Sequence, residues 1–63
     1  MKSKQLIKML TDDGWYTVRQ KGSHMVMKHD TKKGTLIVPN HGSAEVGTGL
    51  EMKLLKQAGI RGS

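Results

Sequence analysis

The chain contains no cysteine among its 63 residues. That absence excludes disulfide bonds and thiolate metal ligands, which often support very small domains. The three histidines, His24, His29 and His41, are dispersed and are weak evidence for a metal site of another kind. Because a chain of this length buries only ~60% of its unfolded surface, we expect one tightly packed domain, or one that a bound partner stabilises.

Long hydrophobic runs are also missing. No apolar stretch approaches the ~20 residues that a membrane-spanning helix requires, and the chain does not open with a secretory signal. These two absences predict a cytoplasmic protein that has no membrane partner.

Acidic residues are scarce. Five Asp and Glu residues stand against eleven Lys and Arg residues, which gives a net charge of +6. A field of this sign attracts polyanions, and nucleic acid is the most common polyanion in a cell. An acidic protein surface would be attracted by the same field, so the charge alone leaves both RNA and protein open as partners.

Residues 3–13 have the periodicity of an amphipathic helix. Their apolar side chains recur at i, i+1 and i+4 and form one stripe. Ser3 is expected to cap the first turn with its side-chain oxygen, and Gly14 to end the helix in a left-handed conformation.

A second helix is predicted to run to about Ala58. Thr48 and Glu51 have the spacing of a capping box, so the helix is expected to begin there. Leu50, Leu54 and Ala58 recur at helical spacing and are predicted to form its buried stripe.

The segments between the helices favour three β-strands, at 15–19, 24–29 and 35–38. Their aromatic, β-branched and other apolar residues are typical of strands. Short polar turns join them, the first over 20–23, and Pro39 is expected to end the third strand because it cannot donate to a ladder. Connections this short join antiparallel neighbours, so the strands are predicted to form a meander.

The expected fold class is therefore α+β, in the order α-β-β-β-α, with a three-stranded antiparallel sheet and both helices on one face. Residues 1–60 are predicted to form a single domain, and 61–63 are interpreted as a tail, such as the remnant of an expression tag. Double-stranded-RNA-binding domains share this topology, which favours RNA binding by analogy of fold only.

Alternation along the second strand sorts its side chains. Met25, Met27 and His29 are expected on the face beneath the helices, whereas His24 and Lys28 share the open face. Two histidines that face opposite ways cannot easily chelate one ion, so no metal site is predicted. A histidine beside a fixed ammonium group is suited to phosphodiester chemistry.

His24 and Trp15 each have an ordinary structural interpretation. A single histidine near a turn usually hydrogen bonds to a backbone carbonyl, so His24 alone does not establish catalysis. Trp15 could stack on an unpaired base, but packing in the core beside Gly14 is the better prediction.

Four segments, read in order, add a resemblance to a known family. They are Lys21-Gly22-Ser23-His24, Val38-Pro39-Asn40-His41, the helix start at Gly47-Thr48, and the stretch from Leu54 to Ile60. Together they resemble the HicA family, the small messenger-RNA-cleaving toxins of HicAB toxin–antitoxin systems. The resemblance covers residues 3 to about 60.

This resemblance implies a double-stranded-RNA-binding-like domain that cleaves messenger RNA without a metal or other cofactor and so arrests translation. The family's essential histidine matches His24, and Gly22 and Ser23 match the residues that precede it. His41 matches a second motif and is carried over as a binding residue. The implied partners are RNA and a HicB-like antitoxin, which covers the active face of a toxin that is monomeric within a larger complex.

The predicted mechanism uses the RNA's own 2′-hydroxyl as the nucleophile, with His24 as the proton-transfer group. Lys28 and Lys21 are predicted to hold the phosphate, with Lys21 the weaker because it is expected on a turn. His41 is the candidate for a second proton-transfer group if its loop folds back. The alternatives are a double-stranded-RNA-binding module without catalytic activity and a domain that binds an acidic protein.

Overall fold

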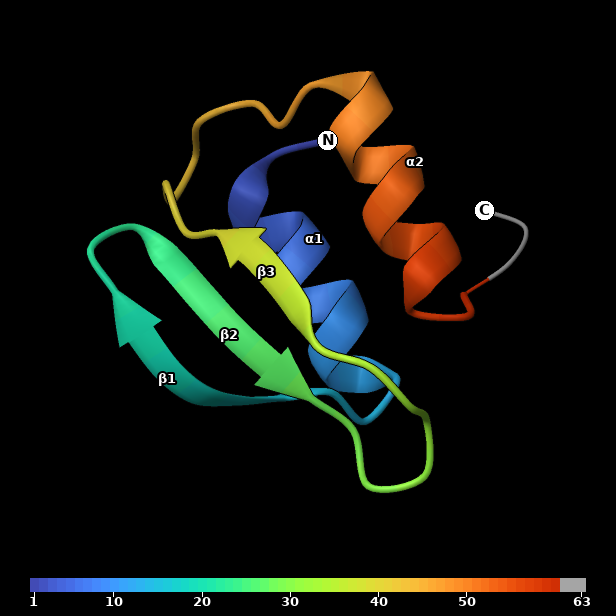
Figure 1. Cartoon of the computed structure of the whole chain (residues 1–63). Helices are drawn as coiled ribbons and strands as arrows, with labels where there is room; N and C mark the ends of the chain where they lie inside the picture. Colours follow the sequence, from blue (N-terminus) through green and yellow to red (C-terminus); the bar gives the residue numbers. More distant parts are fainter. Residues whose placement is uncertain (61–63) are drawn as a thin grey trace.

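Two helices and a three-stranded sheet make up the computed structural model, which describes residues 1–60 (Figure 1). In chain order the elements are α1 (Ser3–Asp12), β1 (Tyr16–Lys21), β2 (His24–Lys28), β3 (Leu36–Pro39) and α2 (Thr48–Gln57). The predicted α-β-β-β-α order is confirmed, with element ends that differ by one or two residues. The interpretation of residues 61–63 as a tail lies outside the described part of the chain.

The strands form the predicted antiparallel meander, in the order β1-β2-β3. The turn between β1 and β2 consists of Gly22 and Ser23, and Gly22 adopts a positive φ of 59°. Glycine adopts this conformation without the steric penalty that a side chain would bring. The turn therefore fixes the point at which β2 begins.

Pro39 is part of β3, although the strand was predicted to end before it. Pro39 pairs with His24, and the neighbouring Asn40 N–H donates to Ser23 O at 2.6 Å. Hydrogen-bonded and non-hydrogen-bonded pairs alternate along antiparallel strands. Pro39 therefore occupies a non-hydrogen-bonded position, where the ladder needs no N–H donor.

The hydrophobic core lies between the sheet and the two helices. In Figure 1, α1 lies behind the sheet, and α2 follows on the β3 side. The buried apolar residues are Leu6, Leu10, Trp15, Met25, Met27, Leu36, Val38, Val46, Leu54, Leu55 and Ala58. These residues come from every element except β1, whose residues are all exposed. Neither helix of the described chain is long and apolar enough to span a bilayer.

The side chains of β2 alternate as predicted. Met25 and Met27 are buried in the core, whereas His24 and Lys28 are exposed. Trp15 is also buried, which confirms the prediction that it packs in the core. The sheet therefore has one face covered by the helices and one open face.

The start of α1 differs from the prediction. The N-cap is Lys2, and Ser3 is the first helical residue and fully buried. Its hydroxyl donates to Pro39 O and accepts from His41 N–H at 3.1 Å. Ser3 therefore connects the helix to the segment after β3 instead of capping its own first turn.

The end of α1 matches the prediction. Gly14 has a φ of 108°, and its N–H donates to Thr11 O at 3.0 Å. Trp15 N–H donates to Leu10 O, also at 3.0 Å. This pair of bonds is a Schellman motif, which satisfies the last carbonyls of the helix and turns the chain toward β1.

The capping box predicted for α2 is absent. The N-cap is Gly47, which has no side chain to offer, and Thr48 is the first helical residue. Glu51 instead pairs with the α-amino group of Met1, with Oε1 3.1 Å from the nitrogen, and Glu45 lies equally close. Hydrogen bonds to these two carboxylates raise the pKa of the amino group above its ordinary value of 8.0, with the Glu51 bond contributing most.

The apolar stripe of α2 is also shorter than predicted. Leu54 and Ala58 are buried, together with Leu55, but Leu50 is 42% exposed to solvent. The first turn of α2 therefore leaves its leucine partly open to solvent.

A polar cluster joins the C-terminal ends of the two helices. Lys32 Nζ donates to Asp13 Oδ2 at 2.6 Å, just after α1, and to Ala58 O at 2.9 Å, the C-cap of α2. The Lys32 hydrogen bond is the main reason that the pKa of the Asp13 carboxyl lies below its ordinary value of 3.8. Lys32 therefore connects both helix ends through one ammonium group.

His29 belongs to the same cluster. Its Nδ1 accepts from Thr31 N–H at 3.1 Å and from Lys32 N–H at 3.2 Å. These two donors assign the ring proton to Nε2, which donates to Asp13 O at 2.7 Å. The ring also meets Trp15 edge to face, with centroids 5.2 Å apart, so its role is structural.

Candidate active site

His24 is the first residue of β2 and directly follows the Gly22-Ser23 turn. Its side chain is exposed on the open face of the sheet, as alternation predicts. The imidazole is therefore accessible to a large substrate that approaches this face.

Lys21 lies directly opposite His24 in the β1–β2 ladder. The expectation that Lys21 lies on the turn is wrong, because β1 extends through Lys21. Residues that pair directly share a face, and their Cα atoms are about 5 Å apart. Lys21 is therefore closer to His24 than Lys28 is, which reverses the predicted order of the two lysines.

A β-bulge at Val18 determines which side chains of β1 face the same way as His24. Thr17 pairs with Met27, but the next pair is Arg19 with Val26, so Val18 is an extra residue. Regular alternation from Thr17 would put Arg19 and Lys21 on the helix side of the sheet. The extra residue moves both cations to the open face, where no sequence pattern predicted them.

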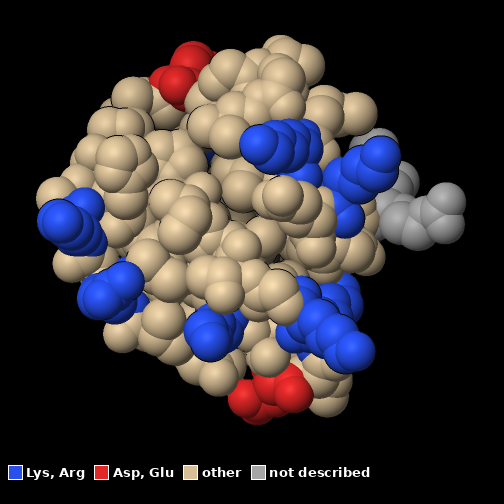
Figure 2. All heavy atoms as spheres, viewed as in Figure 1, with Lys and Arg blue, Asp and Glu red and all other residues tan. Residues whose placement is uncertain are grey.

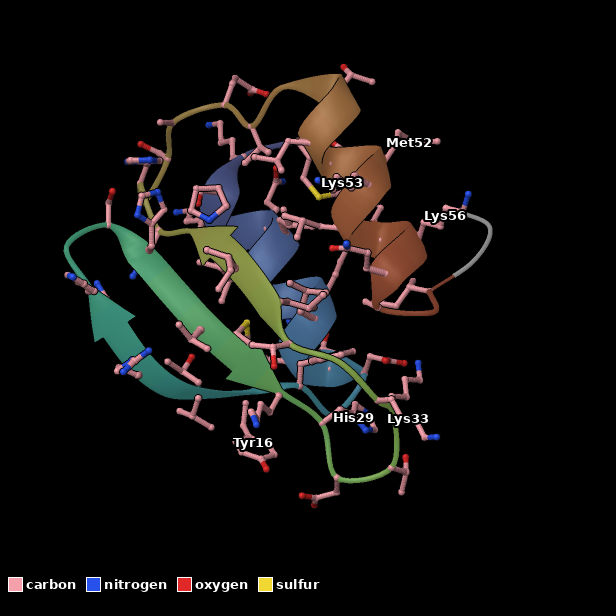
Figure 3. The ribbon with its side chains drawn as sticks, in the orientation of Figure 1. Tyr16, His29, Lys33, Met52, Lys53 and Lys56 are labelled. Carbon is pink, nitrogen blue, oxygen red and sulfur yellow. The ribbon has the colours of Figure 1, made fainter. Side chains whose placement is uncertain are left out.

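Lys28 lies at the other end of β2 and pairs with Tyr16. A strand rises about 3.3 Å per residue, so Lys28 is ~13 Å from His24 along β2. Tyr16 is 44% exposed on the same face (Figure 3). These two residues form the far end of the surface and cannot contact the same group as His24. The sequence pattern predicted only a strand position for Tyr16 and did not mark it as a site residue.

The loop after β3 folds back against the Gly22-Ser23 turn. Besides the bond from Asn40 N–H to Ser23 O, Asn40 Nδ2 lies 3.4 Å from Gln20 Oε1. The loop also positions the backbone of His41, whose N–H donates to Ser3 Oγ, and leaves its side chain exposed. His41 follows Pro39, the partner of His24, by two residues. Within residues 1–60, no hydrogen bond joins the two imidazoles.

The open face carries positive charge and no strand carboxylate. The acidic residues Asp12, Asp13, Asp30, Glu45 and Glu51 all lie outside the strands. The sheet lies in front of α1 in Figure 1, so Figure 2 views this face, with basic side chains across it and acidic atoms near two ends. Such a surface attracts a polyanion, and its strands carry no carboxylate that would repel one.

Comparison with known proteins identifies the family. A family model described as the HicA toxin of bacterial toxin–antitoxin systems matches residues 3–60. The chain belongs to the HicA toxin family. Among solved structures it is similar to a chain in a toxin–antitoxin complex from Streptococcus pneumoniae, with 31% sequence identity and a TM-score of 0.76. That match covers 95% of this chain and 98% of the other. A search of curated proteins found no match.

The HicA assignment confirms the family resemblance and identifies the chain as a toxin of a toxin–antitoxin system. The predicted residues Lys21, Gly22, Ser23 and His24 form one continuous strand–turn–strand unit, and the His41 loop packs beside it. Lys28 alone lies apart from this group.

His29 lies apart from His24 in this HicA domain, as predicted. It lies on the opposite face of the sheet from His24, inside the cluster with Asp13 and Trp15. Among residues 1–60, no three His, Asp or Glu side chains are grouped closely enough to hold a metal ion.

Proposed function

We propose that this HicA toxin is an endoribonuclease that cleaves messenger RNA, with His24 as its proton-transfer group. The observation that carries the proposal is the position of His24, exposed on a basic face and directly opposite Lys21. An imidazole gains and loses a proton near neutral pH, and a fixed ammonium group stabilises a phosphate beside it.

The chemistry begins at the 2′-hydroxyl of the RNA. His24 accepts the hydroxyl proton, the oxygen attacks the adjacent phosphorus, and the bond to the 5′ oxygen breaks. The Lys21 ammonium group opposes the negative charge that develops on the phosphoryl oxygens. No metal or other cofactor takes part in this scheme.

The departing 5′ oxygen requires a proton. His41 is the proposed donor, because its loop is fixed against the turn that precedes His24 and its side chain is exposed. Gly22 and Ser23 support the same site by positioning β2 and by binding the loop backbone. Arg19, Lys28 and Tyr16 extend the surface on which the flanking RNA lies.

The proposed protein partner is a HicB-like antitoxin, which binds a monomer of the toxin within a larger complex. The relevant support is that the similar chain from Streptococcus pneumoniae was solved in a toxin–antitoxin complex. An antitoxin that covers the open face would keep RNA from His24.

Production of the chain in bacteria without antitoxin tests this function. We expect growth arrest with the wild type, normal growth with His24→Ala at equal protein level, and rescue of the wild type by the antitoxin. Growth that continues with the wild type would contradict the toxin activity. Arrest by both variants, with RNA bound but intact, would instead support the RNA-binding module without catalysis.

A further inference from the structure

A groove lies between the outer side of β3 and α2. It is lined by Thr35, Ile37, Leu50, Lys53, Leu54 and Gln57 and has a volume of about 310 Å³. Ile37 and Leu50 remain 52% and 42% exposed, so two aliphatic side chains in contact with solvent border it. No residue that we assign to catalysis lines this groove.

The outer edge of β3 has unpaired backbone groups beside this groove. Asn40 N–H donates to Ser23 O, so Ser23 and Asn40 occupy a hydrogen-bonded position of the β2–β3 ladder. Hydrogen-bonded and non-hydrogen-bonded pairs alternate along the ladder, which makes Val26 and Ile37 a non-hydrogen-bonded pair. The N–H and C=O of Ile37 therefore point away from β2. Within residues 1–60, no side chain or loop hydrogen bonds to them.

The two edge strands of the sheet, β1 and β3, differ in how well they are protected against pairing with a further strand. β1 has a bulge at Val18 and carries Arg19 and Lys21, features that hinder the pairing of a further strand. At β3, the Pro39 end is unavailable for strand pairing, because Ser3 Oγ already donates to Pro39 O. The stretch around Ile37 has neither a bulge nor a charge. This stretch of β3 is the part of the sheet that is suited to strand addition.

We propose that an extended, acidic segment of the antitoxin pairs with β3 at Ile37 and inserts an apolar side chain into the groove. This assignment rests on the proposed function for the identity of the partner. Strand addition supplies main-chain hydrogen bonds, and the groove supplies specificity. Lys53 within the groove and the net charge of +6 favour an acidic segment. The same charge disfavours a second copy of this chain.

The proposed position also explains how binding would inhibit cleavage. A strand paired with β3 lies two strand spacings from β2, or about 10 Å. Side chains from that strand would reach across the face on which Ile37 and His24 both lie. The segment would therefore exclude RNA without contacting the imidazole.

The test measures the affinity of purified antitoxin for toxin variants that all carry His24→Ala, so that they can be produced safely. Leu50→Glu should weaken binding at least about tenfold, because it puts an anion into the groove. Met52→Glu is the matched control, since Met52 is 62% exposed on the same helix and does not line the groove. Met52 points away from the sheet in Figure 3. Equal weakening by both changes, or by neither, would overturn the proposal.

Two further measurements separate the charge from the strand pairing. Lys53→Glu should weaken binding more than Lys56→Glu, because only Lys53 lines the groove. Hydrogen exchange at the Ile37 amide should be fast in the free toxin and slowed at least about tenfold in the complex, since pairing would protect it. An Ile37 amide that exchanges equally fast in both states would overturn strand addition.

The same variants separate this proposal from the proposed nuclease function. With His24 restored, Leu50→Glu should cleave RNA as the wild type does but escape inhibition. Loss of cleavage with Leu50→Glu alone would identify the groove as an RNA surface, and a dimer that Leu50→Glu dissociates would identify a second copy. Either result would overturn the antitoxin assignment. Absence of RNA cleavage by the wild type would contradict the nuclease function. The differences in antitoxin affinity would still support binding of the antitoxin at the groove.

Discussion

Lys21 and His24 are directly paired across the β1–β2 ladder, on the open face of the sheet. The pairing depends on a two-residue turn at Gly22 and Ser23 and on the bulge at Val18. It places a permanent cation within reach of any phosphate that contacts the imidazole. The catalytic proposal therefore depends on a pair of residues rather than on an isolated histidine.

Lys21→Ala should lower the rate of RNA cleavage more than Lys28→Ala. A hydrogen bond to a charged group contributes about 1.5–3 kcal/mol, so loss of the Lys21 contact is expected to slow cleavage at least tenfold. Lys28, ~13 Å from His24 along β2, should affect RNA affinity and change the single-turnover rate little. Single-turnover cleavage at saturating enzyme distinguishes the two. Equal losses of rate would contradict the ranking.

Tyr16→Ala should weaken RNA binding, whereas Tyr16→Phe should retain it. The ring is exposed beside Lys28, and a base stacked on an aromatic ring contributes about 1–3 kcal/mol. The measurement is a titration of the His24→Ala protein with single-stranded RNA at fixed salt. Equal affinity of the alanine and phenylalanine variants would exclude stacking.

Leu54→Ala and Leu50→Ala should differ sharply in their effects on stability, although both residues lie on α2. Leu54 is buried, and truncation of a buried leucine costs about 2–5 kcal/mol. Leu50 is exposed to a large extent, so its truncation should cost roughly 1 kcal/mol or less. Denaturant unfolding at neutral pH measures both free energies. Similar losses would show that Leu50 belongs to the core.

The Lys32–Asp13 pair predicts a pH dependence of folding. The pKa of Asp13 is held below 3.8 in the folded chain, so the pair stabilises the fold at pH values above 3.8. That contribution is lost as the pH falls through the lowered pKa. Lys32→Met should reduce stability at pH 7 and flatten its decline in acid, because the pKa of Asp13 then returns toward its ordinary value.

Lys33→Met is the control for this experiment, since it removes the neighbouring, exposed lysine. Unfolding by denaturant from pH 7 down to pH 3 measures both variants. If Lys33→Met alters the pH profile as much as Lys32→Met, the dependence reflects net charge rather than this ion pair.

Local patterns were enough to predict the order of the elements and the two faces of β2. Met25 and Met27 alternate with exposed residues in a short strand, and Gly14 ends α1 in the conformation that glycine favours. In both cases the information lies within a few neighbouring residues. The family motif around His24 added the expected function.

The remaining features depend on contacts between distant segments. Ser3 is a residue type that often caps helices, but its hydroxyl donates to Pro39 O instead. Leu50 has the spacing of a buried helical residue but stays 42% exposed. The bulge at Val18 reverses the face of every later residue in β1, and no residue type in that strand marks it. The lower rank predicted for Lys21 has a separate cause: the residue was expected on the turn, whereas β1 extends through it.

The most direct test of the account compares RNA cleavage by purified wild type and His24→Ala, both shown to be folded and to bind RNA equally. General acid–base catalysis typically contributes ~10²–10⁴-fold, so the variant should cleave slower by that factor with affinity unchanged. The wild type should cleave equally well in the presence of a chelator. Equal cleavage by the two proteins would contradict the role of His24.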